Sequence, residues 1–218
     1  MHIKLLGDRL ESENLELKHS FIILLIVVIT ETIFTYFIRS NMAVFAGFRL
    51  VQTIIILSII FAIYRNFNPI GLKDLTKGFL RGVLWSSGFG LLVLILGSTL
   101  YFMNYNPFSL FRVRLPSSGL QLALYFSAIC IIAPVYEEIV FRGVIYRLLR
   151  KRGVVVAVIV SSTIFSLMHM INGDISIVNI IGGFIFAISF EVEKNLVTPI
   201  TIHFAGNASI FLLVYLGS

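Results

Sequence analysis

The sequence is poor in charge and in cysteine, and each shortage excludes a class of protein. Only 13% of its 218 residues are charged, whereas soluble domains carry about 25%, so a soluble globular domain is excluded. The single cysteine, Cys130, rules out an intrachain disulfide. Hydrophobic residues make up 58% of the chain, and the mean hydropathy is +0.97. A polytopic integral membrane protein is therefore expected.

The positive charge of the chain has a distribution typical of membrane proteins rather than of nucleic-acid binders. Most of the 17 lysines and arginines lie in short loops between apolar runs, as the positive-inside rule describes. Seven runs are candidate spans: 20–38, 43–64, 79–103, 119–149, 154–171, 175–190 and 196–216. With these spans, twelve cations fall on the side of the N-terminus and three on the other. This bias predicts a cytoplasmic N-terminus.

One stretch places two carboxylates and a guanidinium within apolar sequence. Ionisable residues are costly inside a membrane, and those that occur there mark functional sites. Glu138 and Arg142 stand four residues apart, so they share a helix face and are expected to form an ion pair. Glu137 points about 100° away from Glu138 and has no local cation, so it must find partners on other helices or in water. A glutamate of this kind is suited to general-base catalysis.

Other polar groups in the apolar runs allow plainer interpretations. Glu31 and Arg49 lie on neighbouring predicted spans, where they either pair with each other or lie near an interface that the long arginine side chain can reach. Pro134, just before the glutamates, would free the carbonyl of Cys130 in a regular α-helix. It would also kink the run and open space beside the carboxylates.

Two histidines lie in later apolar runs, each four residues from a second residue of interest. His169 follows Phe165, and His203 precedes Asn207. Counted from the nearest basic turn at about 1.5 Å per residue, Glu137 and both histidines lie roughly 14–25 Å deep. Their levels agree within about two helix turns, so a single cluster is geometrically feasible.

These residues form three ordered motifs: E-E-x-x-x-R, F-x-x-x-H and H-x-x-x-N. On successive hydrophobic segments, over about residues 119–210, they resemble the CPBP family of CAAX prenyl endopeptidases and bacteriocin-processing or immunity proteins. The resemblance implies an all-α, polytopic transmembrane helix bundle of about seven spans with a catalytic core in its last four helices. Residues 119–216 would form this core, and 1–118 would supply a lead and three accessory helices. By analogy, the bacterial plasma membrane is the expected location.

The resemblance also assigns roles to the motif residues. It implies that Glu137 activates the attacking water, assisted by His169. His203 and Asn207 would stabilise the oxyanion. The other implied members of the site are Glu138 beside the base, with Arg142 and Phe165 in support.

The chemistry of these groups leaves several alternatives open. No cofactor is required, although Glu137, His169 and His203 could bind Zn²⁺ with one position open for water. The expected partners are the lipid bilayer and a hydrophobic, lipidated or CAAX-like peptide, with no nucleic acid. A non-catalytic immunity or scaffold protein, a proton-relay transporter, or a purely structural polar network would use the same buried groups. Inverted repeats, which would favour a transporter, are not evident.

Overall fold

The computed structural model describes residues 15–37, 41–106, 113–170 and 176–217, and all regular structure in these ranges is helical. Most of the polar lead expected before the first span lies outside the described residues, as does the linker 171–175. The helices outside the central segment are α2 (Leu17–Phe37), α3 (Met42–Tyr64), η1 (Asn68–Ile70), α4 (Leu75–Phe102), α8 (Val154–Met168), α9 (Ile177–Glu193) and α10 (Val197–Leu216).

The polytopic helical bundle predicted from the sequence is confirmed. Each of the seven apolar runs is helical, with ends no more than four residues from the predicted ones. In the part of the chain that the structure describes, five helical segments are long and apolar enough to cross a membrane: Leu17–Tyr36, Met42–Tyr64, Asn68–Phe102, Gly119–Arg150 and Val197–Leu216. With 15 and 17 residues, α8 and α9 are shorter than the 20 or so residues that a spanning helix needs. The seven-span count and the orientation of the chain stay predictions.

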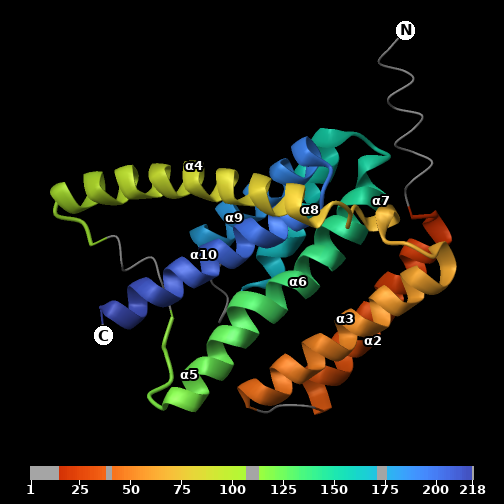
Figure 1. The fold of residues 1–218 in the computed structure, drawn as a ribbon, viewed down its shortest axis with the longest axis horizontal. Helices are drawn as coiled ribbons and strands as arrows, with labels where there is room; N and C mark the ends of the chain where they lie inside the picture. The colour runs from red at the N-terminus through yellow and green to blue at the C-terminus, as the bar shows by residue number, and fades with distance from the viewer. Residues whose placement is uncertain (1–14, 38–40, 107–112, 171–175, 218) are drawn as a thin grey trace, which may run out of the picture.

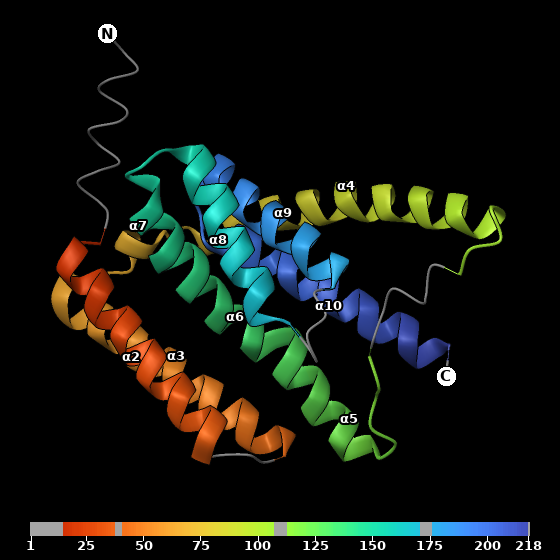
Figure 2. The same ribbon diagram turned by 180° about the vertical axis from the view of Figure 1, so that it is seen from behind.

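A continuous helical segment over residues 119–150 lies at the centre of the fold (Figures 1 and 2). It runs through five consecutive pieces: α5 (Gly119–Phe126), the π-helical η3 (Ser127–Ile132), α6 (Ala133–Glu138), the π-helical η4 (Ile139–Tyr146) and α7 (Arg147–Arg150). The α2–α3 pair packs along one side of this central segment, and α8, α9 and α10 pack on the other (Figure 2). Helix α4 lies against α10.

Local sequence signals explain where several helices begin. Asn41, Asp74, Ser118 and Ser176 each precede a helix, and each side chain accepts a hydrogen bond from a backbone N–H two or three residues further on. Such caps satisfy amide groups that the first helical turn leaves unpaired. Between α3 and α4 the chain turns at Gly71, whose φ of 81° favours glycine.

Glycines allow α4 to pack closely against α10. A Cβ atom on Gly78 would lie 2.6 Å from the Cβ of Val197, and one on Gly82 would lie 2.4 Å from the Cβ of Thr201. Both distances are shorter than side-chain carbons tolerate, so the two helices approach through glycine surfaces, as membrane helices commonly do.

We expect Gly82→Ala to lower the free energy of unfolding by about 1–3 kcal/mol, because the added methyl forces α4 away from α10. Gly90→Ala, eight residues further along the same helix, is the matched control, since a Cβ there would have no neighbour within 4 Å. It should leave stability unchanged or raise it by up to about 1 kcal/mol. Denaturant titration in detergent micelles would measure both, and equal values would contradict close glycine packing.

Candidate active site

The two adjacent glutamates lie at the end of α6, between the two π-helical pieces of the central segment. A π-helix pairs each carbonyl with the amide five residues on, and such turns are frequent at functional sites. In η3 the N–H of Ala133 accordingly donates to the carbonyl of Ala128. The next amide in this register would be that of Pro134, which carries no hydrogen, so the carbonyl of Ile129 lacks its helical donor.

Asn207 supplies the missing donor from α10. Its Nδ2 donates to the carbonyl oxygen of Ile129 over 2.8 Å. The sequence predicts a free carbonyl at Cys130, because α-helical pairing joins each carbonyl to the amide four residues on. In the π-helical register the partner is five residues on, so the free carbonyl is that of Ile129, and Asn207 binds it. Among the described residues, the polar contact of Asn207 is therefore with the backbone of η3 rather than with Glu137 or the histidines.

Glu138 and Arg142 form the predicted ion pair, with both side chains fully buried. Arg142 Nη1 donates to Glu138 Oε1 over 3.1 Å, and its Nη2 donates to the carbonyl of Gly183 in α9 over 2.9 Å. The guanidinium also lies 4.7 Å from the ring centroid of Phe165 in α8. The pair therefore joins the central segment to both α8 and α9.

His203, on α10, hydrogen-bonds to the same glutamate. Its Nδ1 lies 2.9 Å from Glu138 Oε1, and its ring stacks on Phe186 at a centroid distance of 4.5 Å. A carboxylate paired with an arginine is an acceptor, so the proton of His203 belongs on Nδ1. Its Nε2 is then directed towards Glu137, at 3.8 Å from Oε2.

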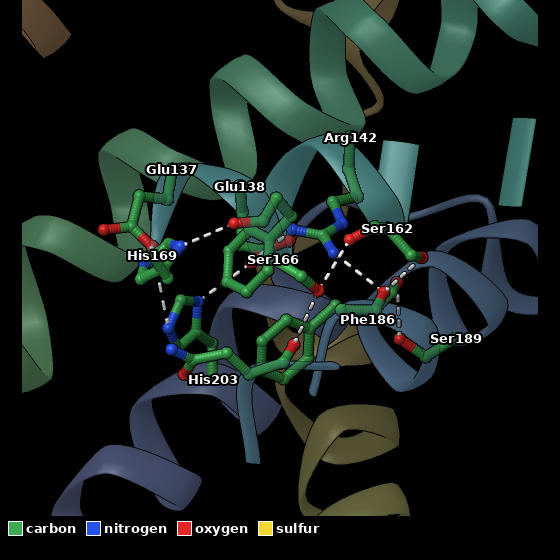
Figure 3. Close-up of polar contacts among 12 residues, drawn as sticks. Glu137, Glu138, Arg142, Ser162, Ser166, His169, Phe186, Ser189 and His203 are labelled. Carbon is green, nitrogen blue, oxygen red and sulfur yellow. Dashed lines mark hydrogen bonds and ion pairs between the residues drawn. The ribbon is translucent and has the colours of Figure 1, made fainter. Parts of the chain in front are cut away.

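Both histidine rings direct a nitrogen atom towards the Oε2 atom of Glu137 (Figure 3). His169 Nε2 lies 3.3 Å from this oxygen. These partners come from other helices, as the absence of a local cation predicts. The side chains of Glu137 and His169 are 15% and 28% exposed, whereas that of Glu138 is fully buried. The accessible part of the cluster is therefore the Glu137–His169 pair.

His169 lies just beyond the last residue of α8 rather than within the helix. Its Nδ1 donates to the carbonyl of Phe165 over 2.8 Å, and the two rings lie 4.3 Å apart. A carbonyl only accepts, so Nδ1 carries a proton and the Nε2 of a neutral ring presents a lone pair to Glu137. Glu137 and His169 are thus arranged to share one proton.

Other members of the cluster carry no recognisable sequence motif. Phe186 stacks on His203, and Gly183 accepts hydrogen bonds from Arg142 and from Ser162 Oγ. All three new members, Phe186, Gly183 and Ser162, lie in apolar helices whose residues look alike in sequence. The packing of α9 against α8, α10 and the central segment brings them to the site.

A comparison with known families bears on these residues. The family model described as type II CAAX prenyl endopeptidase Rce1-like matches residues 119–209. This match supports the CPBP/CAAX protease family for the segment. The CAAX protease segment begins at the first residue of α5, ends within α10, and contains every motif residue discussed above. The family resemblance inferred from the sequence is confirmed, and a membrane protease is the general class that it indicates.

Part of the chain also resembles a bacterial protein. An uncharacterized protein from Mycoplasma capricolum subsp. capricolum is 31% identical over 87 residues, which is 39% of this chain. The matched residues cover 25% of that relative's own length. No solved structure matches the chain.

The family and the donor types raise the question of a metal ion. Among the described residues, no group of three or more histidine, cysteine, aspartate or glutamate side chains has the geometry to hold one. Glu137 Oε2 instead lies 3.3 Å from His169 Nε2 and 3.8 Å from His203 Nε2. Within the described ranges of the chain, this arrangement does not form a ready zinc site.

Proposed function

We propose that this protein is an intramembrane endopeptidase that hydrolyses a peptide bond of a membrane-associated peptide. One observation carries the proposal: the nitrogens of two histidines, each oriented through its other ring nitrogen, face one carboxylate oxygen of Glu137. A base that is held in place by oriented imidazoles is what the activation of water requires.

In the proposed reaction, Glu137 removes a proton from a water molecule with the help of His169. The water oxygen attacks the peptide carbonyl carbon, and a tetrahedral oxyanion forms. The proton then passes to the amide nitrogen as the carbon–nitrogen bond breaks, so a carboxylic acid and an amine leave. No redox partner or second substrate is needed.

Two residues of α10, His203 and Asn207, would stabilise the oxyanion. His203 can donate from Nε2 once this atom is protonated, and the Glu138 carboxylate on Nδ1 stabilises the resulting imidazolium, as the aspartate does in a Ser-His-Asp triad. Asn207 has two amide hydrogens, and one is used on Ile129, so the second would serve the oxyanion. Preorganised donors of this kind usually supply the largest single catalytic contribution.

The substrate would be a hydrophobic or lipidated peptide that reaches the site within the bilayer. The side chains of Glu137 and His169 are partly exposed, so a peptide and the attacking water can approach the pair. The Oε2 atom of Glu137 is itself buried. CAAX-like proteins and bacteriocin or pheromone precursors both fit this description, and the family match supports the class rather than either member.

Purified protein in detergent would be tested for cleavage of a quenched hydrophobic peptide, with and without a chelator, alongside elemental analysis of bound metal. We expect cleavage that a chelator leaves within about twofold of its original rate, because Glu137 and the histidines act directly on water.

His169→Ala combined with His203→Ala should abolish cleavage. One zinc per chain, lost together with activity in the double variant, would overturn the metal-independent mechanism. Binding of the peptide without any cleavage would favour an immunity or scaffold role.

A further inference from the structure

A second buried polar cluster lies on the other side of the central segment from the histidines. Of the two alternatives for Glu31 on α2 and Arg49 on α3, the structure shows the ion pair, and Gln52 joins it by accepting from Arg49 Nη1 over 2.7 Å. Gln52 Nε2 in turn donates to Thr30 Oγ1 over 2.8 Å. The side chains of Glu31 and Arg49 are only 20% and 14% exposed. This group of four residues is called the α2–α3 cluster.

The α2–α3 cluster holds one residue of the central segment from two directions. Tyr136 donates its hydroxyl hydrogen to Glu31 Oε1 over 2.8 Å. The guanidinium of Arg49 lies 4.6 Å from the centroid of the same ring, within cation–π distance. Tyr136 is itself 4% exposed and is the residue immediately before Glu137. Its ring is therefore fixed at both its face and its hydroxyl.

We propose that Tyr136 is a positioning residue and that the α2–α3 cluster, through it, sets the orientation of Glu137 towards the two histidines. This inference rests on the proposed peptidase function. It extends the site beyond the CAAX protease segment of residues 119–209. The α2–α3 pair then belongs to the functional unit instead of being an accessory anchor.

The composition of the cluster favours positioning over simple attachment. The α2–α3 pair makes its main contacts outside itself with the central segment alone. Apolar side chains would hold such helices together as well or better, since replacing a buried ion pair by hydrophobic residues is often neutral or stabilising. Hydrogen bonds add directionality, and one of them joins Glu31 of the cluster to Tyr136, the residue next to the proposed base. A catalytic group needs its orientation fixed to within fractions of an ångström.

The test compares two tyrosines of the same helical segment. Tyr136→Phe and Tyr146→Phe each remove one hydroxyl that donates to a glutamate, over 2.8 Å to Glu31 and 2.7 Å to Glu191. Both rings are at least 95% buried. We expect Tyr136→Phe to lower kcat by about tenfold with KM within about twofold, whereas Tyr146→Phe should keep both near wild type.

A second measurement does not depend on peptidase activity. Nitrogen-15 spectra of protein labelled at histidine report the protonation state of His169 through its contact with Glu137. We expect Tyr136→Phe to shift these signals and Tyr146→Phe to leave them in place. Equal kcat values and unshifted spectra for both variants would overturn the positioning role. If wild-type protein cleaved no peptide while Tyr136→Phe still shifted the spectra, the proposed function would fail and the structural coupling would stand.

Discussion

Glu137→Gln is expected to lower the rate of peptide cleavage by about 10²–10⁴-fold, the usual contribution of a general base. The amide has nearly the same shape as the carboxylate but accepts no proton from water at neutral pH. It also cannot share a proton with His169, whose Nε2 lies 3.3 Å from Oε2. The stability of the protein should change little, because Glu137 takes no part in the buried ion pair of Glu138 and Arg142.

The matched control for this change is Glu193→Gln. The two glutamates have the same side-chain exposure of 15%, and Glu193 accepts a hydrogen bond from Trp85 away from the histidines. Cleavage by the control should stay within about twofold of wild type, since its carboxylate touches no reacting atom. A Glu137→Gln protein that cleaves as fast as the control would exclude Glu137 as the base. It would favour a structural polar network instead.

Arg142→Met is expected to have the largest effect on stability, a loss of about 3–5 kcal/mol in the free energy of unfolding. The substitution leaves the carboxylate of Glu138 fully buried without its cation and also removes the hydrogen bond to Gly183. Denaturant titration in detergent micelles measures this loss. The control is Arg150→Met. The ion pair of Arg150 with Glu191 is 41% exposed at the arginine, so its loss should cost at most about 1 kcal/mol.

The double variant Glu138→Leu with Arg142→Met tests whether the loss of stability comes from leaving one charge of the ion pair buried alone. Removing both charges should recover at least about half of the lost stability, because neither charge is left buried alone. Cleavage should stay low, since His203 Nδ1 then has no carboxylate acceptor. A double variant no more stable than Arg142→Met alone would show that the pair contributes less than the other contacts of Arg142.

Regular spacing explains which parts of the site could be predicted from the sequence. Glu138 and Arg142 are four residues apart on one helix, so their pairing follows from helix geometry alone. For Glu31 and Arg49 the sequence leaves pairing and a position near the interface as alternatives, and the structure shows the pairing. Glu137 was expected to find partners elsewhere, and His169 and His203 provide them.

Features that depend on backbone register or on tertiary packing could not be predicted. The π-helical pairing of η3 has no sequence signal beyond Pro134, so the acceptor for Asn207 could not be identified as Ile129. Tyr136 looked like one more apolar residue of the segment, since its partners on α2 and α3 lie about a hundred residues away in the chain. The lengths of α8 and α9 also differ from full spans, and hydropathy alone does not fix where an apolar helix ends.

The π-helical turn η3 also makes the number of residues in the central segment a property of the site. Such a turn holds one residue more than regular α-helical winding would. The π-helical turn could lose this residue with little rotation, whereas deleting one residue from the regular winding of α6 (Ala133–Glu138) would rotate everything after it by about 100° relative to the turn. Helix α10 contacts the segment at two points, at Ile129 within the turn and at Glu138 beyond it. Such a rotation cannot preserve both contacts, so the residues of α6 between them should tolerate exchanged side chains far better than a gained or lost residue.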